Sequence, residues 1–240
     1  MDGEDVVELA VYGAPGELPE LAEGEAEVAG VRVWVSATEV PDDWAERWKL
    51  FHVPVLVAQR LYLRPPWEPR TACPGAIDLM IDPGRAFGTG AHPTTRLALE
   101  LLLELSDAKG GGSLCDLGCG SGVLSIAASR LGFAPVTALD SDRLALEATA
   151  ANAAANGVSL AAIERAELRD ASPPSADVIA ANLTRLLLLR MAASMREVPR
   201  ALIASGLLVE EADEVGAAFA PLRERRRLCD RGWSALLLEA

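Results

Sequence analysis

A glycine-rich segment at residues 114–123, LCDLGCGSGV, has the residue types of a ligand-binding turn. An apolar run leads into Gly118, Gly120 and Gly122, and a helical pattern follows them. Glycines let the backbone approach a ligand closely at the carboxyl end of a strand, where doubly wound sheets bind their ligands. The spacing GxGxG departs from the GxGxxG fingerprint of dinucleotide-binding turns.

Asp116, two residues before the first glycine, narrows the chemistry of that ligand. A carboxylate at this point repels a pyrophosphate and suits a cation. S-adenosylmethionine carries an ammonium and a sulfonium and no phosphate, so it fits the charge of the turn better than a dinucleotide does. The alternative is a tight strand-to-helix turn in which the acid only caps the helix.

A second acid, Asp140, ends the next apolar run, 22 residues after Gly118. In nucleoside-binding sheets an acid at this place accepts hydrogen bonds from the ribose hydroxyls. The alternative is an ordinary helix cap, for which Asp142 is a nearby competitor. The turn and the acid together favour S-adenosylmethionine over NAD as the cofactor.

Asn182 ends a third apolar run, DVIAAN. An amide at that carboxyl end can face the methyl group of the cofactor and accept a hydrogen bond from an incoming amine, which makes Asn182 the candidate catalytic residue. The sequence continues Leu-Thr-Arg, without the Pro-Pro-aromatic sequence of many amino-methylating enzymes. The alternative is an N-cap for the helix that follows.

Short apolar runs alternate with helical periodicity from about residue 113 onward, and this pattern predicts the elements that carry these residues. Strands interleaved with helices imply parallel crossovers and a sheet covered on both faces. The fold class is therefore α/β and doubly wound, with room for an antiparallel edge at the end of the chain. We expect strands at 113–117, 136–140, 177–181, 201–204 and 235–238, and helices at 123–131, 144–156, 186–195 and 210–219.

The first 70 residues have a different pattern. β character at 6–12 and 28–35 flanks an acidic stretch rich in Gly and Pro, and DDWAERWKL at 42–50 has the pattern of a short capped helix. Four prolines then mark a hinge before a strand at 77–81. They are Pro65, Pro66, Pro69 and Pro74.

This change of pattern predicts two domains. We expect a small N-terminal module with its linker helix at residues 1–65, whose role in substrate recognition is implied by the family resemblance described below. The main domain is expected at residues 66–240.

The composition excludes several classes of protein. The 240 residues carry 22 Lys and Arg against 35 Asp and Glu, a formal charge of −13, which repels nucleic-acid backbones and anionic membranes and attracts cationic partners. No apolar run reaches membrane-spanning length, and the N-terminus, MDGEDVVELA, is acidic where a secretory signal is basic. Four cysteines without a CxxC pair and two histidines argue against a structural zinc site. These features predict a cytoplasmic protein without a metal.

Residues 81–95, IDPGRAFGTGAHPTT, together with DLGCGSG, ALDSD and ANL, closely resemble the ribosomal protein L11 lysine methyltransferase family. The stretch DDWAERWKLFHVPVLVAQRLYLRPPW looks like the linker of that family, so the resemblance covers about residues 41–240. It implies a seven-stranded, mostly parallel class I methyltransferase sheet with a small N-terminal α+β module. It also implies methyl transfer from S-adenosylmethionine to amino groups of ribosomal protein L11 or another basic protein, on lysine side chains or an N-terminal amine.

Carried over by motif, the resemblance implies cofactor contacts at Thr95, Gly118, Asp140 and Asn182, and a loop at 87–90 that closes over the methionine end. His92, in the same motif, is expected to position that loop. The candidate cofactor-binding residues are then Phe87, Gly88, Thr89, Gly90, Thr95, Asp116, Gly118, Gly120, Asp140 and Asn182.

The acceptor is less constrained than the cofactor. The family carries an α+β recognition domain before the linker, and roughly forty residues precede Asp42, enough for about half of it. We therefore expect a shortened recognition region, and three hypotheses stay open. The first is methylation of ribosomal protein L11. The second is the same chemistry on another protein or a small amine, and the third is a non-catalytic S-adenosylmethionine-binding module or a nucleotide-binding oxidoreductase.

Overall fold

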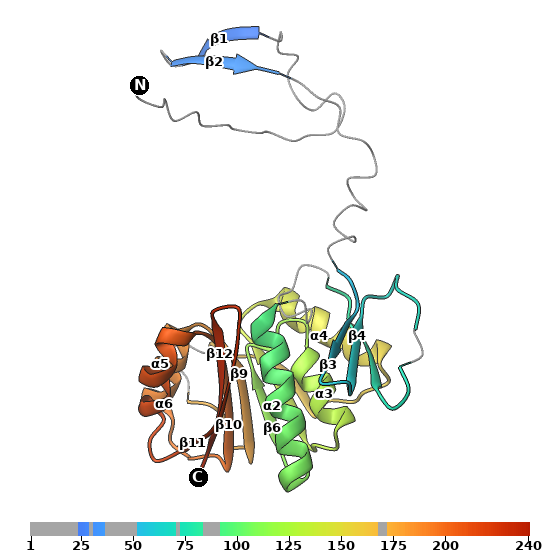
Figure 1. The fold of residues 1–240 in the computed structure, drawn as a ribbon, viewed down its shortest axis with the longest axis vertical. Helices are drawn as coiled ribbons and strands as arrows, with labels where there is room; N and C mark the ends of the chain where they lie inside the picture. The colour runs from blue at the N-terminus through green and yellow to red at the C-terminus, as the bar shows by residue number, and fades with distance from the viewer. Residues whose placement is uncertain (1–23, 29–30, 37–51, 71–72, 84–91, 168–171) are drawn as a thin grey trace. The chain divides into compact units, whose positions relative to one another are not determined.

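The computed structural model describes residues 24–28, 31–36, 52–70, 73–83, 92–167 and 172–240. The chain divides into two compact units, Met1–Arg47 and Trp48–Ala240. In the first unit β1 (Gly24–Val28) and β2 (Val31–Val35) form an antiparallel pair (Figure 1). The β character expected at 28–35 is confirmed by β2 and by Val28, the last residue of β1, and the chain reverses between Val28 and Val31. The strand expected at 6–12 and the helix expected at 42–50 lie outside the described residues.

A seven-stranded sheet forms the centre of the second unit, in the order β11-β12-β10-β9-β6-β7-β8. Neighbouring strands from β8 to β10 run parallel, whereas β12 pairs antiparallel with both β10 and β11. The expected doubly wound, mostly parallel α/β sheet with an antiparallel edge is confirmed. The strands are β6 (Leu114–Leu117), β7 (Val136–Asp140), β8 (Ala162–Arg165), β9 (Val178–Asn182), β10 (Ala201–Leu208), β11 (Arg223–Asp230) and β12 (Trp233–Glu239).

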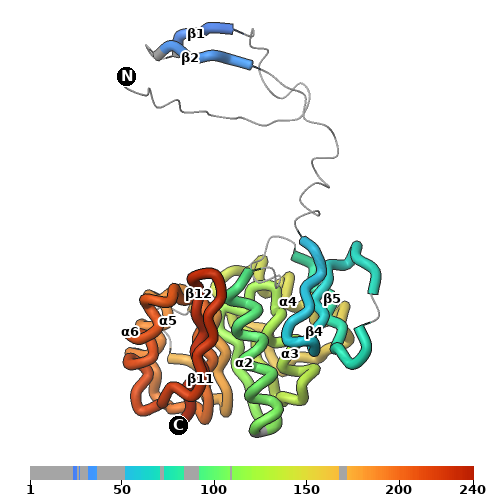
Figure 2. Tube along the Cα trace, viewed as in Figure 1, coloured from blue at the N-terminus to red at the C-terminus, as the bar shows by residue number. Residues whose placement is uncertain are grey.

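Helices cover both faces of this sheet, as Figures 1 and 2 show. α2, α3 and α4 pack over one face, and α5 and α6 pack over the other. A short 3-10 turn, Val209–Glu211, precedes α6. The helices are α2 (Pro93–Lys109), α3 (Val123–Arg130), α4 (Arg143–Ala155), α5 (Arg185–Ser194) and α6 (Ala212–Ala218).

The two faces carry separate hydrophobic cores because side chains alternate along each strand. In β9, Val178 and Ala180 join the core beneath α2 and α3. Ile179 and Ala181 join the core beneath α5 and α6. Near-continuous apolar strands of this kind are the pattern that predicts a sheet covered on both faces.

A second sheet of three strands, in the order β3-β4-β5, precedes the main one in the chain. β3 (Val55–Val57) and β4 (Leu61–Arg64) are antiparallel, and β5 (Ile77–Met80) lies parallel to β4. The proline-rich segment expected as a hinge is the connection between β4 and β5. The functional division at residue 65 stays a prediction.

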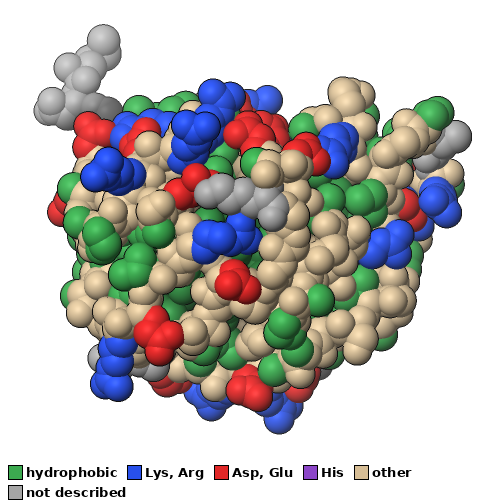
Figure 3. All heavy atoms as spheres, turned by 90° about the horizontal axis from the view of Figure 1, so that it is seen from below, with side chains coloured by type: hydrophobic (Ala, Val, Ile, Leu, Met, Phe, Trp, Pro, Cys, Tyr) green, Lys and Arg blue, Asp and Glu red, His purple; other side chains and the backbone are tan. Residues whose placement is uncertain are grey.

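No helix in the described ranges is long and apolar enough to cross a bilayer. On the face shown in Figure 3, acidic and basic side chains are interspersed and do not gather into one patch. Charge on that face therefore points to no single charged partner.

Candidate functional site

The glycine-rich turn lies between β6 and α3, at the carboxyl ends of the parallel strands. Gly118, Gly120 and Gly122 have φ values of 74°, 55° and 80°, in the left-handed region that favours glycine. The amides of Gly118 and Cys119 both donate to the carbonyl of Leu139, at 2.8 and 3.0 Å. The turn is therefore fixed to the end of β7 by backbone hydrogen bonds.

Asp140 ends β7 beside this turn. Its Oδ2 accepts from the amide of Gly120 at 3.0 Å, and its Oδ1 accepts from the amide of Asp142 at 3.0 Å. The N-cap of α4 is Asp142, whose Oδ1 accepts from the amide of Leu144 at 2.9 Å. The competing role of helix cap thus belongs to Asp142, and Asp140 keeps lone pairs for further donors.

Asp116 lies in β6 below the turn, with 1% of its surface exposed. Its Oδ2 accepts from the amide and the hydroxyl of Ser125, at 3.0 and 2.6 Å, so it does cap the first turn of α3. Its other oxygen, Oδ1, is buried and has no hydrogen-bond partner among the described residues. Burial raises the pKa of Asp116 to about 6, with a smaller contribution from the charge of Asp140. A buried carboxylate with an unused oxygen favours a nearby cation.

Asn182 ends β9, and its Nδ2 donates to Oγ1 of Thr95 at 3.4 Å. These two residues are 87 positions apart, and the fold brings them together where α2 begins beside β9 and β10. The hydroxyl of Ser205 in β10 also donates to the carbonyl of Thr94, at 2.9 Å. The N-cap of α5 is Thr184, so Asn182 is not the cap of that helix.

His92 caps α2, because its Nδ1 accepts from the amide of Thr94 at 3.3 Å and contacts the Thr94 hydroxyl at 2.8 Å. Its ring packs edge to face on Trp233, with centroids 4.8 Å apart. Burial and the charge of Arg96 lower the pKa of His92, which favours the neutral ring that an accepting Nδ1 requires. His92 therefore fixes the start of α2 against the β11–β12 hairpin.

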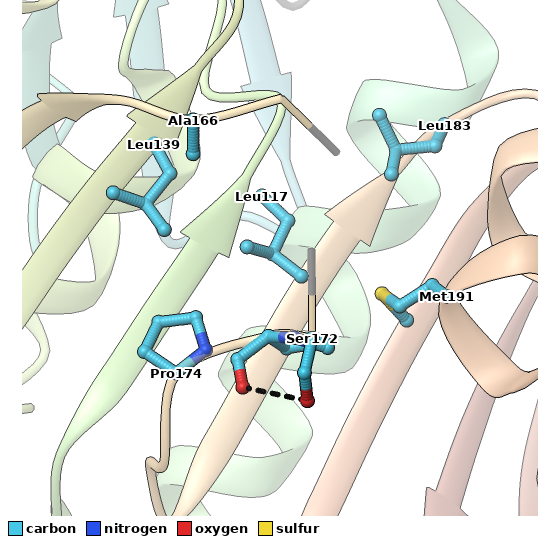
Figure 4. A pocket seen from close by; sticks show the side chains of 8 residues that line it. Leu117, Leu139, Ala166, Ser172, Pro174, Leu183 and Met191 are labelled. Atoms are coloured by element: carbon cyan, nitrogen blue, oxygen red, sulfur yellow. Dashed lines mark hydrogen bonds between the residues drawn. The ribbon is translucent and has the colours of Figure 1, made fainter. Parts of the chain in front are cut away.

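Four of the predicted cofactor residues lie outside the described residues: Phe87, Gly88, Thr89 and Gly90. The others lie around the carboxyl ends of β6, β7 and β9. An apolar pocket lies near these strand ends, between β6, β7 and α5 (Figure 4). It is lined by Leu117, Leu139, Ala166, Ser172, Pro173, Pro174, Leu183 and Met191.

Sequence reasoning did not identify the polar residues of α4 that hold the turn. Thr149 donates to the carbonyl of Gly120 at 3.1 Å, and Asn152 donates to the carbonyl of Ser121 at 2.9 Å. Both side chains are buried, with 0% and 2% exposed. The available signal was a pair of polar residues at helical spacing in an alanine-rich helix.

Comparison of the sequence with known proteins identifies a family and close relatives for most of the chain. Residues 19–239 match the family described as ribosomal protein L11 methyltransferase (PrmA). The chain is 40% identical over 202 residues to the ribosomal protein L11 methyltransferase of Citrifermentans bemidjiense, covering 81% of this chain and 66% of that protein. It is 39% identical over 220 residues to the protein of the same name from Geotalea uraniireducens, covering 84% and 69%.

A solved structure of a protein with a similar name also resembles the fold of this chain. The crystal structure of a ribosomal protein L11 methylase from Lactobacillus delbrueckii subsp. bulgaricus superposes with a TM-score of 0.68 at 28% identity, covering 78% of this chain and 98% of that one. The chain spans about two thirds of the length of the curated relatives named above.

Proposed function

Because the chain belongs to the ribosomal protein L11 methyltransferase family, we propose that it transfers methyl groups from S-adenosylmethionine to amino groups of ribosomal protein L11, on lysine side chains or the N-terminal amine. The observation that carries the proposal is the site at the ends of β6, β7 and β9. There a glycine turn, two carboxylates and an amide lie on neighbouring strands.

The residues of this site fit S-adenosylmethionine by their charge. Asp140 offers a carboxylate to the ribose hydroxyls, and the unused Oδ1 of Asp116 is a buried negative site beneath the turn. Gly118 and Gly120 carry no side chains, so the backbone at these two positions can approach the ligand. When bound, the cofactor supplies a methyl group on a sulfonium, which is transferred by in-line displacement.

Asn182 is assigned the positioning of the acceptor amine. A lysine amine in water has a pKa near 10.4, so neutralising it at pH 7 costs about 5 kcal/mol. A desolvated site next to a sulfonium lowers that cost because it disfavours the ammonium. The amide of Asn182 can accept a hydrogen bond from the neutral amine, whereas a carboxylate there would stabilise the unreactive ammonium. Its contact with Thr95 holds the amide in place.

The same site argues against a nucleotide-binding oxidoreductase. A pyrophosphate would lie above the buried charge of Asp116, and Val123 stands where the dinucleotide fingerprint has its third glycine. Calorimetry with S-adenosylmethionine and with NAD separates the two. Binding of NAD and not of S-adenosylmethionine would overturn the methyltransferase proposal.

We expect Asp140→Ala to weaken S-adenosylmethionine binding by about 1.5–3 kcal/mol, because a charge-assisted bond to the ribose is lost. Asp142→Ala is the matched control. It removes the N-cap of α4, which costs about 1 kcal/mol of stability, and leaves the carboxylate of Asp140 in place. Isothermal titration of both variants measures the difference. Equal affinities for the cofactor would refute the ribose assignment.

We further propose that residues 1–41 help to hold the acceptor and do not bind the cofactor. Every predicted cofactor residue follows Ile81 in the chain. A shortened protein that starts at Asp42 should keep its affinity for S-adenosylmethionine and methylate ribosomal protein L11 at least tenfold more slowly, because remote binding energy aligns the amine with the methyl group. Equal rates for the full and the shortened protein would exclude this role.

The acceptor itself is identified by mass spectrometry of ribosomal protein L11 from cells that lack the gene. We expect the loss of methyl groups from L11 and their return when the gene is restored. Unchanged L11 masses, with a labelled cofactor still transferring methyl to other lysate proteins, would favour another protein acceptor. We expect the reaction to occur in the cytoplasm, where ribosomal proteins are made.

A further inference from the structure

Two asparagines one helical turn apart, Asn152 and Asn156, lie at the carboxyl-terminal end of α4 and face the end of β5. Asn156 accepts from the amide of Met80 at 2.9 Å and donates to the carbonyl of Met80 at 2.7 Å. Asn152 accepts from the amide of Asp82 at 2.9 Å and donates to its carbonyl at 3.2 Å. The two side-chain amides therefore pair with the chain as a neighbouring strand would.

The spacing explains why this pairing works. Residues i and i+2 of an extended chain are about 6.6 Å apart, and residues i and i+4 of a helix rise about 6 Å along its axis. Asn156 is thus in register with Met80, and Asn152 is in register with Asp82. The pairing fixes the position of the chain as it leaves β5.

The two asparagines differ in their third contact. The amide of Asn156 donates back to the carbonyl of Asn152 in the same helix, at 2.8 Å, whereas Asn152 reaches the glycine turn. Its second N–H donates to the carbonyl of Ser121 in the glycine turn, at 2.9 Å. One buried amide, 2% exposed, therefore joins the segment after β5 to the turn between β6 and α3. Both of its N–H groups donate, one to the carbonyl of Asp82 and one to that of Ser121, and its oxygen accepts from the amide of Asp82.

We propose that Asn152 is a positioning residue of the cofactor site, which couples the segment at residues 80–83 to the glycine turn so that the two move together. In the sequence, Gly84 and Arg85 alone separate that segment from the AFGTG motif. The effect on cofactor affinity rests on the function proposed above. The coupling of the two segments is a property of the fold and can be measured without a ligand.

No substitution of similar size makes this set of contacts at position 152. Aspartate keeps the acceptor but faces the two carbonyls with a carboxylate, which cannot donate to them. Leucine has a similar volume and can form a hydrogen bond neither with the amide of Asp82 nor with the two carbonyls. Asn156→Leu is the matched control. It breaks an equal pair of hydrogen bonds to Met80 and one to the backbone carbonyl of Asn152, and it leaves the contact of the Asn152 side chain to Ser121 intact.

Two measurements on the full chain test the proposal. Hydrogen exchange should be at least tenfold faster in Asn152→Leu at the amides of Asp82, Gly120 and Gly122, and in Asn156→Leu at the amide of Met80 alone. The dissociation constant for S-adenosylmethionine should rise at least tenfold in Asn152→Leu and stay within threefold in Asn156→Leu. If Asn152→Leu does not fold, Asn152→Ala takes its place, with the same expectations.

The outcomes separate the two proposals. Faster exchange at Asp82 with unchanged exchange at the glycine turn, or an unchanged dissociation constant in folded Asn152→Leu, overturns the role of Asn152. An equal rise of the dissociation constant for S-adenosylmethionine in both variants would show an effect of general stability, and this result also overturns the role of Asn152. If the unaltered protein does not bind S-adenosylmethionine, the proposed function fails, and the exchange pattern still decides the coupling.

Discussion

Gly206→Ala is expected to destabilise the protein by about 4 kcal/mol and to abolish methyl transfer. Gly206 has a φ of 87° and lies at the bulge of β10, between Ser205 and Leu207. A Cβ at this position would lie 2.3 Å from the carbonyl oxygen of Leu183, which is backbone and cannot rotate away. The left-handed conformation adds about 1–2 kcal/mol for any residue with a Cβ. Chemical denaturation measures the loss.

The site is affected because Leu183 directly follows Asn182, and its amide donates to the carbonyl of Ser205 at 3.0 Å. Moving Leu183 away from a new methyl group moves the candidate catalytic amide with it. Gly216→Ala is the control. Gly216 lies inside α6, and the nearest neighbour of a new methyl group would be Leu236 Cδ1 of β12 at 3.5 Å, an ordinary contact. We therefore expect the substitution to be neutral or to stabilise the protein by about 0.5–1 kcal/mol. Equal stabilities of the two variants would contradict the close approach of Leu183 to Gly206.

Asp116→Asn is expected to stabilise the ligand-free protein by about 2–3 kcal/mol at pH 8 and to weaken S-adenosylmethionine binding at least tenfold. The folded pKa of Asp116 is about 6, above the ordinary value of 3.8, because burial disfavours its charge. The folded protein then binds more protons than the unfolded chain between those values. Its free energy of unfolding therefore falls as pH rises from about 4 to 6, and stays lower above pH 6.

An asparagine carries no charge, so this fall is absent in the variant, and the difference between the two proteins disappears below pH 4. The affinity for the cofactor should change with pH in the opposite direction to the stability, because a cationic ligand favours the ionised carboxylate. Affinity in the unaltered protein should rise as pH increases through 6, and the variant should lack that rise. Denaturation and titration at pH 4.5 and pH 8 measure both effects. If stability and cofactor affinity depend on pH in the same way in both proteins, the ionisation of Asp116 does not cause these changes.

Ser125→Ala is the matched control for Asp116→Asn. Its hydroxyl donates to Oδ2 of Asp116 at 2.6 Å and stabilises the charged form. Removing it should destabilise the protein at pH 8 by about 1–2 kcal/mol, the opposite sign to Asp116→Asn.

The elements around the site were predictable from the sequence because their patterns are strong. β7 lies at 136–140 as expected, and the strand, glycine turn and helix from Leu114 to Arg130 follow the predicted order within one residue. Apolar runs covered on both faces leave little ambiguity about a parallel strand. The positions of Asp140 and Asn182 at the ends of β7 and β9 were predictable for the same reason, since each residue directly ends such a run.

The edge strands were not predicted, because tertiary pairing and not apolar alternation forms them. β11 reads RERRRLCD and is largely exposed, yet it pairs along its length with β12. β8 is four residues long, with half of them charged. Neither strand buries enough apolar surface to give a period-two signal.

Contacts between distant segments were also beyond sequence reasoning. Thr95 and Asn182 were each expected near the cofactor, but nothing in the sequence shows that one would donate to the other. The role of Asn152 depends on β5 ending beside α4, which is a property of the three-stranded sheet. That sheet lies in a region where prolines favoured a hinge.

Methyl transfer to purified ribosomal protein L11 tests the proposed function most directly. The full chain is incubated with labelled S-adenosylmethionine and L11 prepared from cells that lack the gene, and the label and the intact mass of L11 are followed over time. We expect label on lysine side chains or the N-terminal amine of L11, with mass increments of whole methyl groups, and no transfer by Asn182→Ala at saturating cofactor. Cofactor binding without any label on L11 would contradict the assignment of L11 as the acceptor.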